Sequence, residues 1–235
     1  MRIKVIVLAL VTTAVLFQNF VSFDIAFDPK YKVNDESRRE HARELLGQKF
    51  LKSLASEQPS DVSLSIEVYN LVQRHSPRKN QKRIEKIAKT ILEEANRYNV
   101  DPIFLASVIK TESGFNHLAK GSSGEVGLMQ LMPATGEYIA KRIRIKNYRG
   151  ARTLRDPAKN IRIGAAYLSY LRQKFANRAY KYVPAYNMGP GNVVKVFNRT
   201  GRPKVYSSKV IKYYESFYRQ IYVSQMFKNP NLALK

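Results

Sequence analysis

The sequence predicts an all-α protein, on three observations. Apolar residues recur at intervals of three and four positions along most of the chain, two aspartate–proline pairs have the form of helix starts, and no stretch alternates convincingly between apolar and polar residues. With 235 residues, of which 44% are hydrophobic, the chain is long enough for one domain of ordinary size and an additional segment.

The first 23 residues predict an export signal that remains attached as a membrane anchor. Arg2 and Lys4 precede an uncharged, mostly apolar stretch over residues 5–23, which is about long enough for one helical span. Phe20 and Phe23 are too bulky for a good cleavage site, so we favour an uncleaved anchor over a cleaved signal, and either over a buried helix. Because positive residues stay in the cytoplasm, the rest of the chain is expected in the periplasm, anchored to the inner membrane or secreted if the signal is cleaved.

Residues 24–80 are charged and mainly helical in pattern, and we interpret them as a stalk or a small helical subdomain. Apolar side chains near helical spacing predict a helix over residues 36–54 and a shorter one over residues 63–72. From residue 81 the helical signals become stronger, so residues 81–235 are expected to form the main domain.

The main domain is predicted to consist of helices, with the unusual residues in the loops between them. Asp101 and Asp156 each precede a proline, which is the arrangement of an N-cap followed by proline at the first helical position. The predicted helices cover residues 82–98, 102–112, 133–143, 157–171, a short segment ending near 187, 193–197 and 207–227.

The composition restricts the partners and the chemistry. A formal charge of +23 implies a polyanionic partner, and because an exported protein rarely meets nucleic acid, we expect an anionic membrane or wall surface and no nucleic acid. The absence of cysteine excludes a thiol nucleophile, a thiolate metal site and a disulfide framework. His41, His75 and His117 have no metal-binding spacing and are predicted as surface residues, so neither a metal nor a cofactor is expected.

Glu112 is the candidate catalytic residue. It lies on the last turn of an almost entirely apolar helix, where desolvation and the negative end of the helix dipole both favour a protonated carboxyl. A carboxyl that stays a proton donor near neutral pH suits general-acid attack on a glycosidic bond. Taken alone, Glu112 has a commoner explanation as an exposed helix-end glutamate, because a sequence pattern does not show a pocket.

Three ordered segments resemble the signature motifs of the soluble lytic transglycosylase catalytic domain. They are ESGFN at residues 112–116, GLMQLMP at residues 127–133 and AYNMGPG at residues 185–191. The 15-residue offset between the first two motifs also matches, and the resemblance covers roughly residues 82–200. It implies a lysozyme-like helical fold with a groove for peptidoglycan, so that residues 81–235 would be the catalytic domain of a monomer.

The resemblance also implies a reaction and its partner. Peptidoglycan glycan strands would be cut without water between N-acetylmuramic acid and N-acetylglucosamine. Glu112 matches the family's lone catalytic glutamate, which first protonates the glycosidic oxygen and then takes the proton of the muramic acid 6-hydroxyl as that oxygen attacks C1. Because this step is intramolecular and leaves a 1,6-anhydro end, it needs neither a positioned water nor a second carboxylate.

Four further residues match the family's groove. Gln130 is expected to hydrogen-bond sugar or Glu112, and a buried amide bonded to backbone is its alternative role. Met132 is expected to line the groove or to pack in the core. Tyr186 is expected to bring its hydroxyl to the catalytic carboxyl, and Asn187 to contact substrate or to brace the following turn.

Two positions depart from the family pattern. Gly121 stands where the family commonly carries serine, although a shift of one residue in the loop path would bring the Ser122 hydroxyl to the site. Glu125 occupies a position that is usually small. We interpret it as a solvated loop residue rather than a second catalytic carboxylate, which would open a hydrolytic route.

Three other functions stay open on the sequence alone. A muramidase on a related fold would hydrolyse the same bond, and its product would differ by the mass of a water. A scaffold protein would keep the groove without activity and would dock to an envelope protein complex, and a nucleic-acid binder rests on charge alone. The aromatic side chains over residues 213–222 are expected to pack in the core, with stacking on sugar rings as the alternative for one or two of them.

Overall fold

The structure, a computed structural model, describes residues 31–57, 61–77, 80–199, 201 and 205–228. All regular elements in these ranges are helical, which confirms the predicted all-α class, and the only β features described are two isolated bridges. The elements are α2 (Asp35–Leu46), η2 (Gly47–Lys52), η3 (Leu54–Ser56), α3 (Asp61–His75), α4 (Gln81–Tyr98), α5 (Pro102–Ser113), α6 (Pro133–Arg142), α7 (Ala151–Leu154), α8 (Pro157–Lys174), α9 (Ala179–Met188), α10 (Pro190–Arg199) and α11 (Val205–Lys228), where η marks a 3₁₀ helix.

The predicted anchor over residues 1–23 lies outside the described residues. Within the described part of the chain, no helix combines the length and the apolar character needed to cross a membrane.

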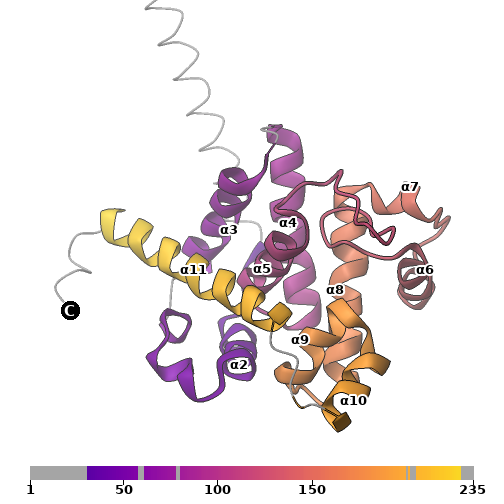
Figure 1. The fold of residues 1–235 in the computed structure, drawn as a ribbon. Helices are drawn as coiled ribbons and strands as arrows, with labels where there is room; N and C mark the ends of the chain where they lie inside the picture. Colours follow the sequence, from indigo (N-terminus) through magenta and orange to yellow (C-terminus); the bar gives the residue numbers. More distant parts are fainter. Residues whose placement is uncertain (1–30, 58–60, 78–79, 200, 202–204, 229–235) are drawn as a thin grey trace, which may run out of the picture.

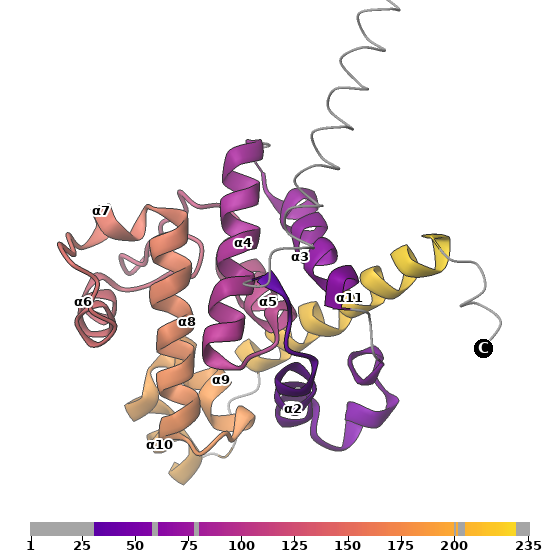
Figure 2. The ribbon, with the colours of Figure 1, turned by 180° about the vertical axis from the view of Figure 1, so that it is seen from behind.

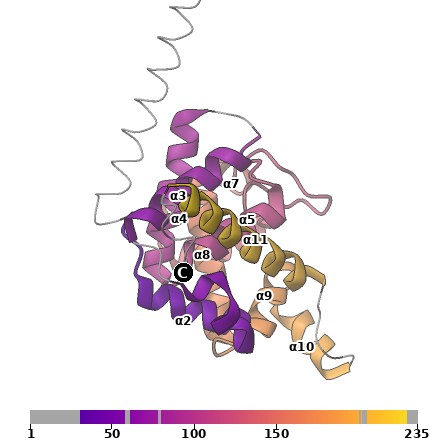
Figure 3. The ribbon, with the colours of Figure 1, turned by 90° about the vertical axis from the view of Figure 1, so that its left-hand side faces the viewer.

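Helix α5 occupies the middle of the molecule. Helices α4 and α8 pack along each other behind it, and α11 crosses its outer side (Figures 1 and 2). Figure 3, turned by 90°, shows α11 across the outside of α5 and α3, and these are helices that it contacts. Helices α6 and α7 lie at one end of the molecule, and α9 and α10 at another (Figure 1).

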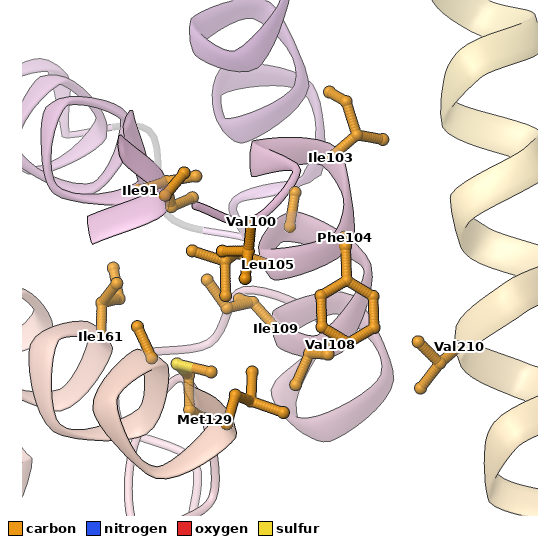
Figure 4. Close-up of a cluster of buried hydrophobic side chains, with 14 of the residues drawn as sticks. Ile91, Val100, Ile103, Phe104, Leu105, Val108, Ile109, Met129, Ile161 and Val210 are labelled. Carbon is orange, nitrogen blue, oxygen red and sulfur yellow. The ribbon is translucent and has the colours of Figure 1, made fainter. Parts of the chain in front are cut away.

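The core forms around α5 because this helix has no polar face over its first two turns. Every residue from 102 to 109 is buried, as expected for a helix that is apolar on nearly all sides. Figure 4 shows its side chains meeting those of the neighbouring helices and of the loops before and after α5. The partners labelled there are Ile91 of α4, Val100 of the loop before α5, Met129 of the loop after α5, Ile161 of α8 and Val210 of α11.

Local capping signals place the helix boundaries. The Asp101 side chain accepts a hydrogen bond from the Ile103 backbone amide at 2.8 Å, and Asp156 caps α8 in the same way. Both predicted starts are therefore confirmed. The helix predicted over residues 36–54 is too long, because Gly47 adopts a left-handed φ of 54° that ends α2, and the chain continues as the 3₁₀ helix η2.

Residues on both sides of the predicted boundary at residue 80 contribute to one hydrophobic core. Helix α3 packs on α4 and α5, η3 packs on α11, and α2 packs on α9. Buried Tyr31, Phe50 and Tyr69 belong to the same cluster as the side chains of α5. The division into a stalk or subdomain and a catalytic domain stays a prediction.

His41 is buried, so the prediction of a surface histidine was wrong for this residue. Its side chain is 0% exposed, Nδ1 accepts a hydrogen bond from the Asp101 amide at 3.1 Å, and Nε2 pairs with the Tyr182 hydroxyl at 2.9 Å. Burial lowers the pKa of His41 well below its usual value, and the charge of Arg172 adds to this effect. The sequence could not show this burial because both partners lie far along the chain.

Candidate active site

A cleft with a volume of about 410 Å³ contains Glu112, at the C-terminal end of α5, in its wall. The loop after α5, the start of α6, and helices α8 and α9 supply the other walls. All five residues predicted to bind substrate line this one cleft: Ser122, Gln130, Met132, Tyr186 and Asn187. Although the chain carries a charge of +23, no lysine or arginine is among the described lining residues, whereas two glutamates are.

Glu112 has the protonation behaviour expected of a general acid near neutral pH. Burial raises the pKa of its carboxyl from 4.5 to about 7. The negative charge of Glu125 also raises this pKa, and a hydrogen bond from the Tyr206 hydroxyl to Glu112 Oε1, 2.5 Å long, opposes the rise. Both protonation states of Glu112 are therefore accessible at pH 7.

Tyr206 is the residue at this site that the sequence analysis missed. It lies near the start of α11, 94 residues after Glu112, and reaches the carboxyl because α11 packs on α5. Burial and the Glu112 charge raise the pKa of Tyr206 well above 10, so its hydroxyl stays a donor. A signal was present: the spacing of four that joins Tyr214 and Tyr218 leads back through Val210 to Tyr206.

Tyr186 had been expected to approach the catalytic carboxyl, and its hydroxyl has another partner. It donates to the Met129 carbonyl at 2.8 Å, while the hydroxyl bound to Glu112 is that of Tyr206. Burial raises the pKa of Tyr186 well above 10, with a contribution from the Glu112 charge. Tyr186 therefore lies near the Glu112 carboxyl, but its hydroxyl binds the loop after α5.

Three helices hold the loop that forms one wall of the cleft. The Ser113 hydroxyl of α5 donates to the Leu128 carbonyl at 2.7 Å, and Tyr186 of α9 binds the Met129 carbonyl. Asn160 of α8, which is 0% exposed, accepts from the Met129 amide at 2.8 Å and donates to two further backbone carbonyls of the chain. Helices α8 and α9 pack on each other, and α4 and α11 connect them to α5, so these contacts fix the loop relative to Glu112.

Gln130 uses its amide nitrogen within the loop. Nε2 donates to the Gly127 carbonyl at 2.8 Å and to the Ala119 carbonyl at 3.2 Å. No described hydrogen bond joins it to Glu112, so the backbone-bonded amide is the role that the structure shows. Its side chain still lines the cleft, and Oε1 is its remaining polar atom.

The other three predicted residues face the open part of the cleft. Met132 is 40% exposed and so is not a core residue. Ser122 and Asn187 are both exposed, and neither side chain forms a hydrogen bond with the described residues. Their polar groups are therefore available to a ligand.

The site lies within a recognised domain. The family described as Transglycosylase SLT domain matches residues 89–208, just over half of the chain. The chain belongs to this family. The SLT domain contains the whole cleft and both residues of the Glu112–Tyr206 hydrogen bond, whereas α2, α3 and most of α11 lie outside it.

Curated relatives share the SLT domain region. A soluble lytic murein transglycosylase from Salmonella typhimurium is 38% identical over 95 residues, which cover 40% of this chain and 15% of the relative. A membrane-bound lytic murein transglycosylase C from Histophilus somni is 33% identical over 124 residues, which cover 49% of this chain and 34% of the relative. The chain thus spans about a third or less of the length of these relatives.

Two solved structures are also similar to this SLT-domain protein. One is an inactive mutant of the lytic transglycosylase Slt from Pseudomonas aeruginosa, with 28% identity and a TM-score of 0.45 over 56% of this chain and 21% of that chain. The other is the 70 kDa soluble lytic transglycosylase from Escherichia coli, with 24% identity and a TM-score of 0.48 over 71% of this chain and 31% of that chain.

Proposed function

We propose that this SLT-domain protein is a lytic transglycosylase, which cuts peptidoglycan glycan strands without water. The observation that carries the proposal is Glu112: a carboxyl with a pKa raised to about 7, in the wall of an open cleft, held by one tyrosine hydroxyl. An acid that must donate and then regain a proton works best when its pKa is near the operating pH.

In the first step Glu112 acts as the general acid. Its proton passes to the oxygen that joins C1 of N-acetylmuramic acid to N-acetylglucosamine, and the bond from C1 to that oxygen breaks. The tyrosine hydroxyl occupies Oε1, and no described group of the protein donates to Oε2. Oε2 is therefore the oxygen from which we expect the proton to leave.

In the second step the same carboxylate acts as the base. The 6-hydroxyl of the muramic acid attacks the electron-poor C1, and its proton returns to Glu112 as the new bond forms. The glycan gains a 1,6-anhydro end, the leaving sugar gains a hydroxyl, and the enzyme is restored. Because the nucleophile belongs to the substrate, the step benefits from proximity and needs no second protein carboxylate.

Mass spectrometry of digested peptidoglycan tests this proposal. The full-length chain should release fragments with 1,6-anhydro ends, and Glu112→Gln should reduce their rate of release roughly a thousandfold, since general acid–base catalysis contributes on that scale. The matched control is Glu137→Gln, which removes a carboxylate from the exposed face of α6, where it pairs with Lys141, and should leave the rate unchanged.

Two results would contradict the proposal. Fragments heavier by one water, with ordinary reducing ends, would identify a hydrolase. A folded wild-type protein that releases no fragments would favour a scaffold protein with an inactive groove.

We also propose where the reaction takes place. The segment over residues 1–23 would keep the protein at the inner membrane, or export it if cleaved, with the cleft in the periplasm. The strongly basic chain would associate with an anionic membrane or wall surface, while the cleft itself lacks basic residues among its described lining. A monomeric state and docking to an envelope protein complex stay predictions.

A further inference from the structure

Gly121 and Glu125 are in close contact beside the catalytic carboxyl. The backbone of Gly121 does not have a positive φ, so its conformation does not require glycine. A Cβ atom added to Gly121 would lie 2.8 Å from Glu125 Cδ and closer still to Oε2, and it would also lie 3.0 Å from Gln130 Oε1. The absence of a side chain at residue 121 therefore provides the space in which the Glu125 carboxylate lies.

A tight loop directs Glu125 into this space. The Gly121 amide donates to the Glu125 carbonyl at 2.9 Å, and the Gly124 amide donates to the Gly121 carbonyl at 3.2 Å. The Ser123 amide then donates to Glu125 Oε2 at 3.1 Å, so the side chain folds back over its own loop. The carboxylate thus has a defined position, which a freely solvated loop residue would lack.

The position of Glu125 leaves part of its carboxylate unsatisfied by protein. It lines the same cleft as Glu112, it is half-buried, and no lysine or arginine of the described residues forms an ion pair with it. Within the described ranges no group donates to Oε1. A half-buried carboxylate without a cation in so basic a chain indicates that its partner is a ligand.

Building on the proposed transglycosylase function, we infer that Glu125 is a substrate-positioning residue whose carboxylate, lying over Gly121, accepts a hydrogen bond from an N–H or O–H group of the glycan. A carboxylate offers only acceptor positions, and an amino-sugar chain presents hydroxyl and acetamido N–H donors. A hydrogen bond to a charged acceptor is also stronger than a neutral one, so this contact orients the sugar ring next to Glu112.

Binding of soluble glycan strands tests the inference without relying on turnover. In full-length protein that carries Glu112→Gln, the further change Glu125→Ala should raise the Kd about tenfold, the effect of one charge-assisted hydrogen bond. The Gly121→Ala change should raise the Kd to a similar extent, because the methyl group displaces the end of the flexible Glu125 side chain rather than backbone, while Gln130 Oε1, 3.0 Å from the added Cβ, has to move only slightly.

The two changes together identify the contact. If Gly121 acts by making room for the carboxylate, the variant with both alanines should bind no more weakly than either single variant. Gly191→Ala is the matched control for the added methyl group, since a Cβ there would meet nothing within 4 Å, and it should leave the Kd unchanged. Thermal unfolding of each variant separates lost binding from lost folding.

Additive losses in the double variant would show that Gly121 does not act by making room for the carboxylate. Two outcomes would overturn the role of Glu125 itself: an unchanged Kd in Glu125→Ala, or reducing ends that the wild-type protein forms and Glu125→Ala does not, while the anhydro ends remain. The last would make Glu125 a base toward water. Weaker glycan binding in Glu125→Ala together with a wild-type protein that forms no anhydro ends would refute the proposed reaction and retain Glu125 as a glycan-binding residue.

Discussion

Helix α5 carries an acidic group at each end, and tyrosines of α11 meet both. Asp101 caps the start of α5 and accepts hydrogen bonds from Tyr214 and Tyr218, while Glu112 in the last turn accepts one from Tyr206. The residue numbers run in opposite directions, so α11 lies antiparallel to α5. The same two helices thus form two carboxyl–tyrosine contacts with different consequences.

The Asp101 contact is closed, in the sense that its carboxyl is buried and bonded to groups of the protein. Its carboxyl is 0% exposed and accepts from two tyrosine hydroxyls at 2.6 and 2.7 Å and from the Ile103 amide. The Arg38 guanidinium donates to the Tyr218 hydroxyl at 2.8 Å and supplies a positive charge nearby. Burial raises the pKa of Asp101, and Arg38 and the hydrogen bonds oppose the rise. Both carboxylate oxygens of Asp101 accept hydrogen bonds from other groups of the protein, so this carboxylate stabilises the fold.

The Glu112 contact is open, in the sense that its carboxyl lies in the wall of a cleft that a ligand can enter. It has one hydrogen-bond donor, no cation among the described residues, and a second glutamate in the same cleft. If Glu112 is the acid of the proposed reaction, burial alone does not make an acid reactive, because Asp101 is the more deeply buried of the two. A reactive acid also needs a raised pKa that few donors oppose and an oxygen that substrate can reach.

Asp101→Ala should have the largest effect on stability. It leaves two buried tyrosine hydroxyls without their acceptor and removes an N-cap, so we expect a loss of about 3–5 kcal/mol in the free energy of unfolding, measured by urea denaturation at pH 7. Asp156→Ala is the matched control, because it removes the cap of α8 from a partly exposed aspartate and should cost about 1 kcal/mol. Equal losses would show that the tyrosines add nothing beyond the cap.

Glu112→Gln should stabilise the folded protein at high pH, whereas Asp101→Ala destabilises it. The pKa of Glu112 is raised from 4.5 to about 7, so the folded protein binds more protons than the unfolded chain between these values. The stability that this group contributes is fully present below pH 4.5 and is lost as pH rises through 7. The variant lacks this loss, so relative to wild type it should gain up to about 3 kcal/mol between pH 4 and pH 8.

Denaturant titrations of both proteins across that pH range measure the difference. A constant difference between wild type and Glu112→Gln would show that the carboxyl is not desolvated in the folded protein.

Tyr206→Phe should reduce activity with little loss of stability. The hydroxyl lowers the pKa of Glu112, so its removal should move the basic limb of the pH–rate profile upward from about 7 and reduce kcat about tenfold, since the carboxyl loses its only described anchor. Tyr214→Phe on the same helix is the control: it should cost about 1 kcal/mol in stability and leave the pH profile in place. If both variants shifted the profile equally, the distinction between the open and the closed contact would fail.

The sequence predicted the features that depend on residues close together in the chain, and it missed those that depend on contacts between distant residues. The starts of α5 and α8 were predicted correctly because the caps at Asp101 and Asp156 act within three residues. The residues expected to bind substrate do line one cleft, since their motifs lie on short loops between predictable helices. The partner of Glu112 was assigned to Tyr186 instead of Tyr206, because docking of α11 onto α5 is a tertiary event.

The contact between Gly121 and Glu125 could not be predicted from the sequence, for a related reason. Both residues were recognised as unusual, but as separate departures from a family pattern. Only the backbone path of the loop shows that the missing side chain of one makes room for the carboxylate of the other. A small residue can thus be explained by its neighbour's side chain as well as by its own φ.

Tyr186→Phe is expected to have the smallest effect. It tests whether the Tyr186 hydroxyl only anchors the loop or also changes the pKa of Glu112. Its hydroxyl donates to the Met129 carbonyl, so its loss should cost about 1 kcal/mol in stability. Because the ring remains in place and Glu112 keeps its bond to Tyr206, the midpoint of the basic limb should not move. A midpoint shift as large as that of Tyr206→Phe would show that Tyr186 shares the carboxyl during turnover, and the open contact would then involve two tyrosines, as the closed one does.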